Sequence, residues 1–216
     1  MELFEAMRTQ GTTRYFEDRE VSDAALYRAF EAARFGPQGG NRQPVRFICV
    51  RDAEAKRQLQ EWYLPPWKAY LQGAMEGEVR VGGLPKVVHD ADHFAEHFAE
   101  IPVLVVVCAE LDGLHPTDHE LGRLSIVGGG SVYPMVQNFM LACRGEGLGT
   151  ALTTLLCMVE PQVKELLGIP EGFATAACVG VGYPAKGFPS KLSRLPVEEL
   201  AFVDRFGQPL TDGAGS

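Results

Sequence analysis

Apolar residues along the chain recur at two spacings, one typical of helices and the other of strands. The first ten residues place their apolar side chains on one helical face, which predicts a short helix that ends near Gly11. The stretch 22–35 shows the same spacing behind a capping residue, Ser22 or Asp23, and predicts a second helix. This second helix leads into a segment rich in glycine.

Three other runs are short, apolar and rich in β-branched or small residues, which is typical of strands. They cover residues 45–50, 103–109 and 174–182. The run VLVVVCA at 103–109 is the most strongly strand-like, so we expect it near the centre of a sheet. Residues 151–155 predict a further short strand or an extended loop.

The longest helical pattern runs from Leu124 to Gly147 and carries Gly128, Gly129 and Gly130 in its first half. Its apolar positions surround more than one face, so the predicted helix packs against its own domain and against something else. Glycines in such a helix allow another backbone to approach closely. The pattern therefore predicts a homodimer. Shorter helices are predicted at 52–59 and 161–167.

Residues 62–67, WYLPPW, form an aromatic and proline-rich elbow in this interpretation. Such a cluster acts either as a hydrophobic cap over a ligand or as an interface. Residues 68–84 have a helical pattern that four glycines interrupt, so we expect a mobile segment there.

The segment between the second helix and the first strand combines turn residues with hydrogen-bonding amides. Pro37 fixes φ, Gly39 and Gly40 carry no side chain, and Asn41 and Gln43 offer donors and acceptors. Bare backbone next to two amides suits a flat polar ligand. The alternative is a helix-to-strand turn without a ligand.

Two further groups of residues suggest ligand chemistry. Thr12 and Arg14 follow the first helix and can contact a phosphate, although an arginine at such a place is often only solvated. His89, His93 and His97 fall on one helical face but span roughly 12 Å along it, so one metal ion could bind two of them at most. The alternative is a half-solvated helix face, and we predict no metal site.

Composition narrows the class of protein. The 216 residues show no repeat, linker or low-complexity segment and are predicted to form one domain, residues 1–216. The net charge of -8 argues against an extended nucleic-acid surface. The five cysteines lie in apolar runs without a C-x-x-C pair, which predicts reduced core thiols and a cytoplasmic location. No apolar stretch approaches the roughly 18 residues of a membrane span, and no signal peptide is expected.

Several segments, taken together and in order, resemble the FMN-dependent nitroreductase family. They are Thr12-Thr13-Arg14-Tyr15-Phe16, the loop Gly36 to Pro44, Gln137-Asn138-Phe139-Met140-Leu141-Ala142 with Gly147-Leu148-Gly149-Thr150, Leu166-Leu167-Gly168-Ile169-Pro170, Gly182-Tyr183-Pro184 and Ser193-Arg194-Leu195-Pro196. Together they extend over nearly the whole chain.

The resemblance implies an α+β, nitroreductase-like fold: a mixed central β-sheet flanked by helices in an intertwined homodimer, with two FMN molecules between the subunits. By the same resemblance, the cofactor-binding residues form three groups. They are Arg8, Thr12, Arg14, Lys191 and Arg194 around the phosphate, Pro37, Gln38, Gly39 and Asn41 reaching the flavin from the partner subunit, and Leu152, Thr153 and Thr154 along the isoalloxazine near N5.

Three positions depart from the family pattern. Gln10 stands where many relatives carry a phosphate-binding arginine, Gln38 replaces a serine, and Lys191 is one residue away from the usual spacing before Arg194. These departures imply either a weaker FMN site or altered cofactor use.

The resemblance implies a ping-pong oxidoreductase that takes hydride from NADH or NADPH and passes it through FMN to an electron-poor acceptor such as a nitroaromatic or a quinone. The sequence shows no nucleophile, triad or metal set, and no protein residue is predicted to be catalytic. Residues 62–67 and the segment that follows are where we expect acceptor specificity. The alternatives are another reaction on the same fold (dehalogenation, flavin breakdown or deazaflavin-dependent reduction) or a non-catalytic flavin-binding dimer.

Overall fold

The computed structural model describes residues 1–76 and 85–212. Its centre is a four-stranded sheet with the order β1-β2-β4-β3, in which all three strand pairs are antiparallel. The strands are β1 (Val45–Val50), β2 (Val103–Glu110), β3 (Gly149–Thr153) and β4 (Phe173–Gly182). The three strands predicted from the sequence are confirmed, and β2 occupies a central position as expected.

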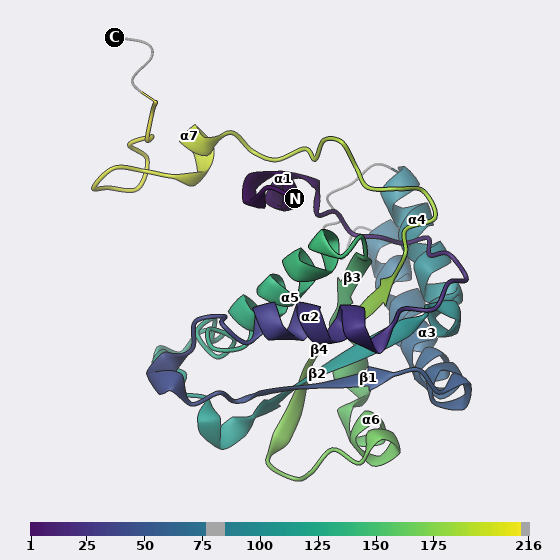
Figure 1. Ribbon diagram of the computed structural model, residues 1–216. Helices are drawn as coiled ribbons and strands as arrows, with labels where there is room; N and C mark the ends of the chain where they lie inside the picture. Colours follow the sequence, from purple (N-terminus) through teal and green to yellow (C-terminus); the bar gives the residue numbers. More distant parts are fainter. Residues whose placement is uncertain (77–84, 213–216) are drawn as a thin grey trace.

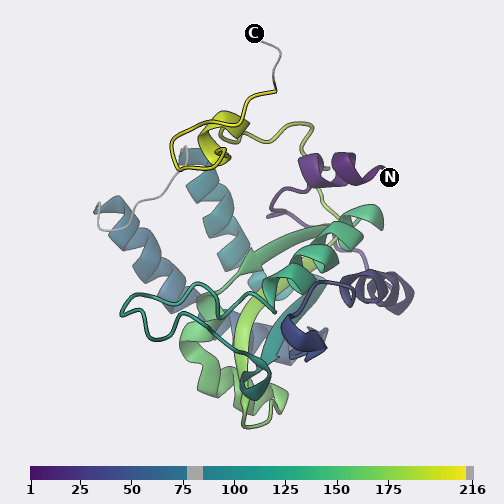
Figure 2. The ribbon, with the colours of Figure 1, turned by 90° about the vertical axis from the view of Figure 1, so that its left-hand side faces the viewer.

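Helices cover both faces of this sheet (Figures 1 and 2). Their bounds are α1 (Leu3–Thr9), α2 (Asp23–Ala33), α3 (Ala53–Met75), α4 (Pro85–Glu96), α5 (Tyr133–Gly145), α6 (Glu160–Leu167) and α7 (Val197–Leu200). Helices α2 and α5 pack on one face, and α3, α4 and α6 pack on the other.

The alternation of side chains along β2 joins the two halves of the core. Val103, Val105 and Val107 face α2 and α5, whereas Leu104 and Val106 face α3 and α4. All five side chains are at most 1% exposed. A strand that is apolar on both faces therefore sits between two helical layers, which explains its unbroken hydrophobic sequence.

The N-terminal segment reaches the outer edge of β3. Thr12 and Thr150 form an isolated parallel bridge, in which the Thr13 N–H donates to the Thr150 carbonyl at 2.8 Å. Helix α2 begins as predicted, because the Ser22 side chain accepts a hydrogen bond from the Ala25 N–H. The chain ends in a segment that passes α1 and extends away from the sheet, with α7 within it (Figure 1).

The predicted helix over 124–147 is wrong in its first half. Helix α5 spans only Tyr133–Gly145, and residues 124–132 form turns and bends. Pro134 lies in the first turn of the helix, where its missing N–H costs nothing. The ring of Tyr133 occupies the place that a Cβ on Gly129 would take, so this glycine makes room for a side chain of the same subunit. Gly128, Gly129 and Gly130 therefore lie outside the helix and do not indicate a second subunit packed against it.

The predicted elbow at 62–67 is also wrong. Helix α3 continues through Pro65 and Pro66. On one of its faces Leu59, Tyr63 and Trp67 are 0%, 3% and 9% exposed, and this burial holds the helix together where proline alone would end it. Of the segment expected to be mobile, residues 68–75 are helical and residues 77–84 lie outside the described part of the chain.

The prediction that all five cysteines lie in the core is wrong for Cys49, which is exposed on β1, and Cys157 is only partly buried. Strand β1 is an edge strand, so its apolar residues are not covered on both faces. Within residues 1–76 and 85–212, no helix has the length and apolar character needed to cross a membrane.

Candidate functional site

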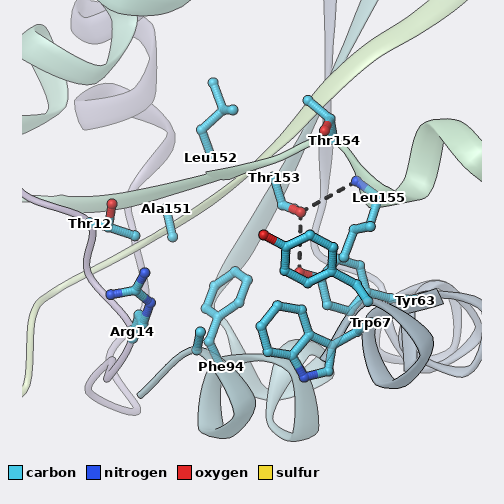
Figure 3. Close-up of a pocket in the computed structure, with 12 residues that line it drawn as sticks. Thr12, Arg14, Tyr63, Trp67, Phe94, Ala151, Leu152, Thr153, Thr154 and Leu155 are labelled. Atoms are coloured by element: carbon cyan, nitrogen blue, oxygen red, sulfur yellow. Dashed lines mark hydrogen bonds between the residues drawn. The ribbon is translucent and has the colours of Figure 1, made fainter. Parts of the chain in front are cut away.

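A cavity of about 330 Å³ lies between the end of β3 and the helices α3 and α4 (Figure 3). One wall is formed by residues 151–155, at the end of β3 and in the turn that follows it. The opposite wall consists of aromatic rings from Tyr63, Trp67 and Phe94. A flat ring system fits between such walls, because rings stack on rings and on extended backbone.

A second hollow of about 680 Å³ adjoins the first. Thr12, Arg14 and Leu152 line both, so the two form one continuous site. The second hollow extends to the C-terminal segment, where Lys186 and Arg194 line it. The site therefore has an aromatic end and a basic end.

Arg14 stands at the junction of the two ends. Its side chain is partly buried, and it makes no hydrogen bond or ion pair with any residue that the structure describes. A guanidinium that has lost part of its water and has no protein partner suits an anionic ligand such as a phosphate. Arg194 is exposed, and its Nη1 donates to the Ser193 carbonyl at 2.7 Å.

The outer edge of β3 offers backbone groups to the same site. Thr150 turns its carbonyl away from β4 to accept from Thr13. In an antiparallel pair, alternate residues direct their backbone groups to the same side. The N–H and C=O of Leu152 therefore face this outer edge, and the Leu152 side chain is 38% exposed beside it. This arrangement presents an amide donor to a planar heterocycle.

A small hydroxyl network fixes the end of β3. The Tyr63 hydroxyl lies 3.1 Å from the Thr153 Oγ1, which also accepts from the Leu155 N–H at 3.4 Å (Figure 3). Burial raises the pKa of Tyr63, and the hydrogen bond with Thr153 opposes that effect. The phenol is therefore neutral at ordinary pH and can donate or accept a hydrogen bond in the cavity.

The structure brings together half of the residues predicted for the cofactor. Those that line the two hollows are Thr12, Arg14, Leu152, Thr153, Thr154 and Arg194. Arg8 and Lys191 do not line either hollow. The family pattern predicted both Arg194 and Lys191 around the phosphate, and only Arg194 lines the larger hollow.

The predicted loop residues Pro37, Gln38, Gly39 and Asn41 lie elsewhere, beside the start of α5. The Gly39 N–H donates to the Ser131 Oγ at 3.0 Å, and the backbone of Met135 leaves no space for a Cβ at Gly36. The Gln38 Oε1 is buried without a hydrogen-bond partner among the described residues. A role for this loop toward a bound cofactor requires a second subunit.

Gln10, which departs from the family pattern, lines the larger hollow. The Gln137 Nε2 donates to the Gln10 Oε1 at 3.0 Å. The amide group of Gln10 keeps two N–H donors for a ligand, although it brings no charge.

Sequence reasoning missed Lys186 and Phe94, whereas Tyr70 lies in the segment where acceptor specificity was expected. Lys186 lines the basic end, and Phe94 and Tyr70 line the aromatic end. Tyr63, Trp67 and Tyr70 follow each other by four and three positions, which is the spacing of one helical face. This signal was present in the sequence, but the two prolines between the aromatic residues concealed it.

Of the three histidines, His89 and His93 lie on α4 and His97 follows its last residue. The His93 and His97 rings lie 3.9 Å apart, and the His97 Nδ1 is 2.8 Å from the His93 carbonyl oxygen. His89 is exposed, its side chain 80% accessible. Among the described residues, no group of three or more potential ligands could hold a metal ion.

The comparisons with known proteins identify the family of this chain. Residues 7–183 match the sequence model of the Nitroreductase family. The chain is 27% identical to a protein of Archaeoglobus fulgidus named as an NADH dehydrogenase/NAD(P)H nitroreductase, over 85% of this chain and 86% of that protein. It is 26% identical to an NADH dehydrogenase of Thermus thermophilus, over 90% and 92% of the two chains.

Among solved structures, an iodotyrosine deiodinase bound to FMN and 3-iodo-L-tyrosine superposes with a TM-score of 0.72. That likeness covers 96% of this chain and 100% of the other, at 23% identity. It shows a shared α+β fold.

This chain belongs to the nitroreductase family, since the match extends over most of its length. The family and the α+β, nitroreductase-like fold predicted from the sequence are confirmed, and with them the oxidoreductase class. The sheet that the structure describes is antiparallel throughout, not mixed, and the intertwined homodimer stays a prediction.

Proposed function

We propose that this protein is an FMN-dependent oxidoreductase that takes hydride from NADH or NADPH and passes it to an electron-poor acceptor in a ping-pong reaction. The observation that carries the proposal is the unpaired, partly buried Arg14 at the junction between a basic hollow and an aromatic cavity. Relatives named as NAD(P)H nitroreductase and NADH dehydrogenase support the choice of donor.

The residues present fit FMN. Its phosphate would be held by Arg14, with Arg194, Lys186 and the Gln10 amide on the same hollow. Its ring system would lie along the edge of β3, where the Leu152 N–H is available as a donor. When bound, FMN supplies the hydride-accepting and hydride-donating chemistry itself.

The chain contributes position and electrostatics. The Leu152 amide would hold the ring edge, and the aromatic wall of Tyr63, Trp67 and Phe94 would exclude water and stack on a flat acceptor. The Tyr63 hydroxyl, kept neutral by burial, would orient a polar group of that acceptor. Acceptors would accordingly be planar and electron-poor, such as nitroaromatics or quinones.

We further propose a homodimer with the flavin between the subunits, in which the loop with Pro37, Gln38, Gly39 and Asn41 reaches the partner's site. The buried, unpaired Gln38 Oε1 supports this arrangement, since such an atom needs a donor. Five free cysteines fit a reducing compartment, the cytoplasm.

The absorbance spectrum of the purified protein tests the proposal. Flavin bands that bleach when NADH or NADPH is added without oxygen, and return when a quinone or nitroaromatic follows, are the expected result. A protein that stays colourless after incubation with FMN would overturn it. Bound flavin that neither nucleotide reduces would favour a deazaflavin donor or a non-catalytic dimer.

Reductive dehalogenation is a second candidate, because a solved structure similar over nearly the whole chain is an iodotyrosine deiodinase. Halide release from 3-iodo-L-tyrosine by the dithionite-reduced protein would distinguish it. If no iodide is released while quinones are reduced rapidly, only the first proposal remains.

A further inference from the structure

A third, smaller pocket opens beside the proposed flavin site. It measures about 150 Å³ and shares Thr12, Arg14 and Lys186 with the larger hollow. The first turn of α4 closes its far side with Lys86. A pocket of this size holds a phosphate group but no flavin ring.

The charges around this pocket are unbalanced. Among the residues that the structure describes, Arg14, Lys86 and Lys186 line it, against one carboxylate, that of Asp90. Asp90 already accepts a hydrogen bond from the Tyr15 hydroxyl at 2.7 Å. Neither lysine forms an ion pair with a described residue, and three cations against one anion leave an excess of two positive charges.

The Tyr15 ring organises this cluster. The Lys186 Nζ sits 3.0 Å from the ring centroid, and the His93 ring stacks on it at 4.2 Å. The pKa of Asp90 is lowered, first by the Tyr15 hydrogen bond and then by the positive charges of Lys186, Lys86 and Arg14. The carboxylate is therefore ionised and fixed, and it holds the surrounding cations near the pocket without neutralising them.

The proposed reaction brings three kinds of phosphate to the site: the phosphate of FMN, the pyrophosphate common to NADH and NADPH, and the 2′-phosphate found only in NADPH. The first and the last are terminal, dianionic groups, whereas each phosphate of the pyrophosphate carries a single charge. The larger hollow already offers Arg194, Gln10 and the β3 edge to the cofactor. The small pocket adds Lys86, which does not line the larger hollow. A dianionic phosphate on a ribose, held next to the flavin, matches the size and the charge of the small pocket.

We propose that the pocket between Arg14, Lys86 and Lys186 binds the 2′-phosphate of NADPH, so that the enzyme prefers NADPH to NADH. The inference rests on the proposed function, because it names the donor that this site accepts. Lys86 is then a specificity-determining residue, and Arg14 serves both phosphates.

The test compares two nucleotides that differ only in the 2′-phosphate. Isothermal titration of the FMN-loaded protein with 2′,5′-ADP and with 5′-AMP should show tighter binding of 2′,5′-ADP by about tenfold or more. Lys86→Gln should weaken 2′,5′-ADP by about five- to tenfold, with 5′-AMP and FMN unchanged. The ratio of kcat/KM for NADPH over NADH should fall by the same factor.

Lys164→Gln is the matched control, since it removes one positive charge on α6, away from α4 (Figure 1). It should leave all these values unchanged. Equal affinity for the two nucleotides in the unmodified protein would overturn the inference, as would an equal effect of Lys164→Gln. Loss of FMN from Lys86→Gln would also overturn it, because the pocket would then belong to the flavin phosphate. A failure of the proposed function itself would look different, as absence of bound flavin.

Discussion

Arg14 is the residue on which most of the site depends, and it leads to the first prediction. Arg14→Met keeps much of the side-chain volume but removes a charge-assisted contact worth roughly 1.5–3 kcal/mol. We expect the Kd of FMN, measured by fluorescence titration, to rise by about one to two orders of magnitude. Arg194→Ala should have a smaller effect, about tenfold or less, because that side chain is exposed and screened.

The exposed Arg57 of α3, which pairs with Glu54, supplies the control for both variants. Arg57→Ala should bind FMN like the unmodified protein. If Arg194→Ala proved the more damaging change, the phosphate would lie at the C-terminal segment and not at Arg14.

At the level of single residues, the sequence predicted which kinds of side chain bind a phosphate better than it predicted where each of them lies in the fold. Arg14 was predicted as a phosphate ligand, and the structure gives it the unpaired, partly buried environment that such a ligand requires. Lys191 followed from the family pattern but does not line the hollow. Lys186 was missed, because its place depends on the return of the chain past Tyr15, a long-range contact with no local pattern.

Helices α3 and α4 are joined across the cavity by one aromatic donor, and this contact gives the second prediction. The Trp67 Nε1 donates to the Asp92 Oδ1 at 2.7 Å. Trp67→Phe removes a hydrogen bond to a charged acceptor, so we expect a loss of about 1–3 kcal/mol in the free energy of unfolding by urea denaturation. The KM for a quinone acceptor should also rise, because the ring lines the aromatic wall.

Trp62→Phe makes the same chemical change on the same helix, at a partly buried position with no hydrogen bond to the described part of the chain. Trp62→Phe should lower the free energy of unfolding clearly less than Trp67→Phe does, and it should leave the KM for the quinone unchanged. Equal losses in the two variants would mean that ring size, and not the bond to Asp92, stabilises the pair of helices.

The turns before α5 depend on a buried carboxylate, and pH therefore affects them. Asp118 accepts from the Arg123 Nη1, the Ser125 hydroxyl and the Ile126 N–H at 2.7, 2.7 and 3.0 Å. The Ser125 and Ile126 hydrogen bonds, together with Arg123, lower the pKa of Asp118 to about 2. Since the folded pKa lies below the ordinary value of 3.8, its stabilisation is present above that value and is lost as pH falls toward 2.

Asp118→Asn should therefore lower the Tm by a constant amount above about pH 5. Thermal unfolding followed by circular dichroism between pH 2 and 7 should show the two curves converging as the pH falls. A difference that persisted undiminished at pH 2 would show that the carboxylate charge plays no part.

These elements also show where sequence patterns mislead. Periodicity placed a helix over residues 124–132, but three glycines and the cost of their ordering favour turns, and Pro134 marks the true start of α5. In α3 the error was the opposite one. Pro65 and Pro66 predicted a break, yet the burial of Tyr63 and Trp67 holds one helix through both prolines. In α3, the tendency of proline to end a helix is overcome by the burial of aromatic side chains, which a local pattern does not show.

At the scale of the whole molecule, exposed apolar side chains gather in the N-terminal helix, in the turns at 121–127 and in the C-terminal segment, and others are scattered over the surface. Phe4 is 69% exposed, Leu200 is 61% exposed and Phe206 is 94% exposed. The C-terminal segment extends away from the sheet (Figure 1). Apolar side chains in such number on an extended segment mark an association surface. The proposed homodimer would cover them.

The last prediction follows from that surface. If the C-terminal segment packs on a second copy, Leu200→Ser and Phe206→Ser together remove two anchors, each worth about 1.5–3 kcal/mol when buried. We expect light scattering after size exclusion to show a dimer for the unmodified protein and a concentration-dependent monomer for the double variant. Because the proposed flavin site needs both subunits, bound FMN should fall in proportion to the dimer. Leu166→Ser, on α6 at the other end of the molecule, should change neither quantity. A double variant that became monomeric but kept its flavin would mean that one chain completes the site, and the loop with Gln38 would then have no part in it.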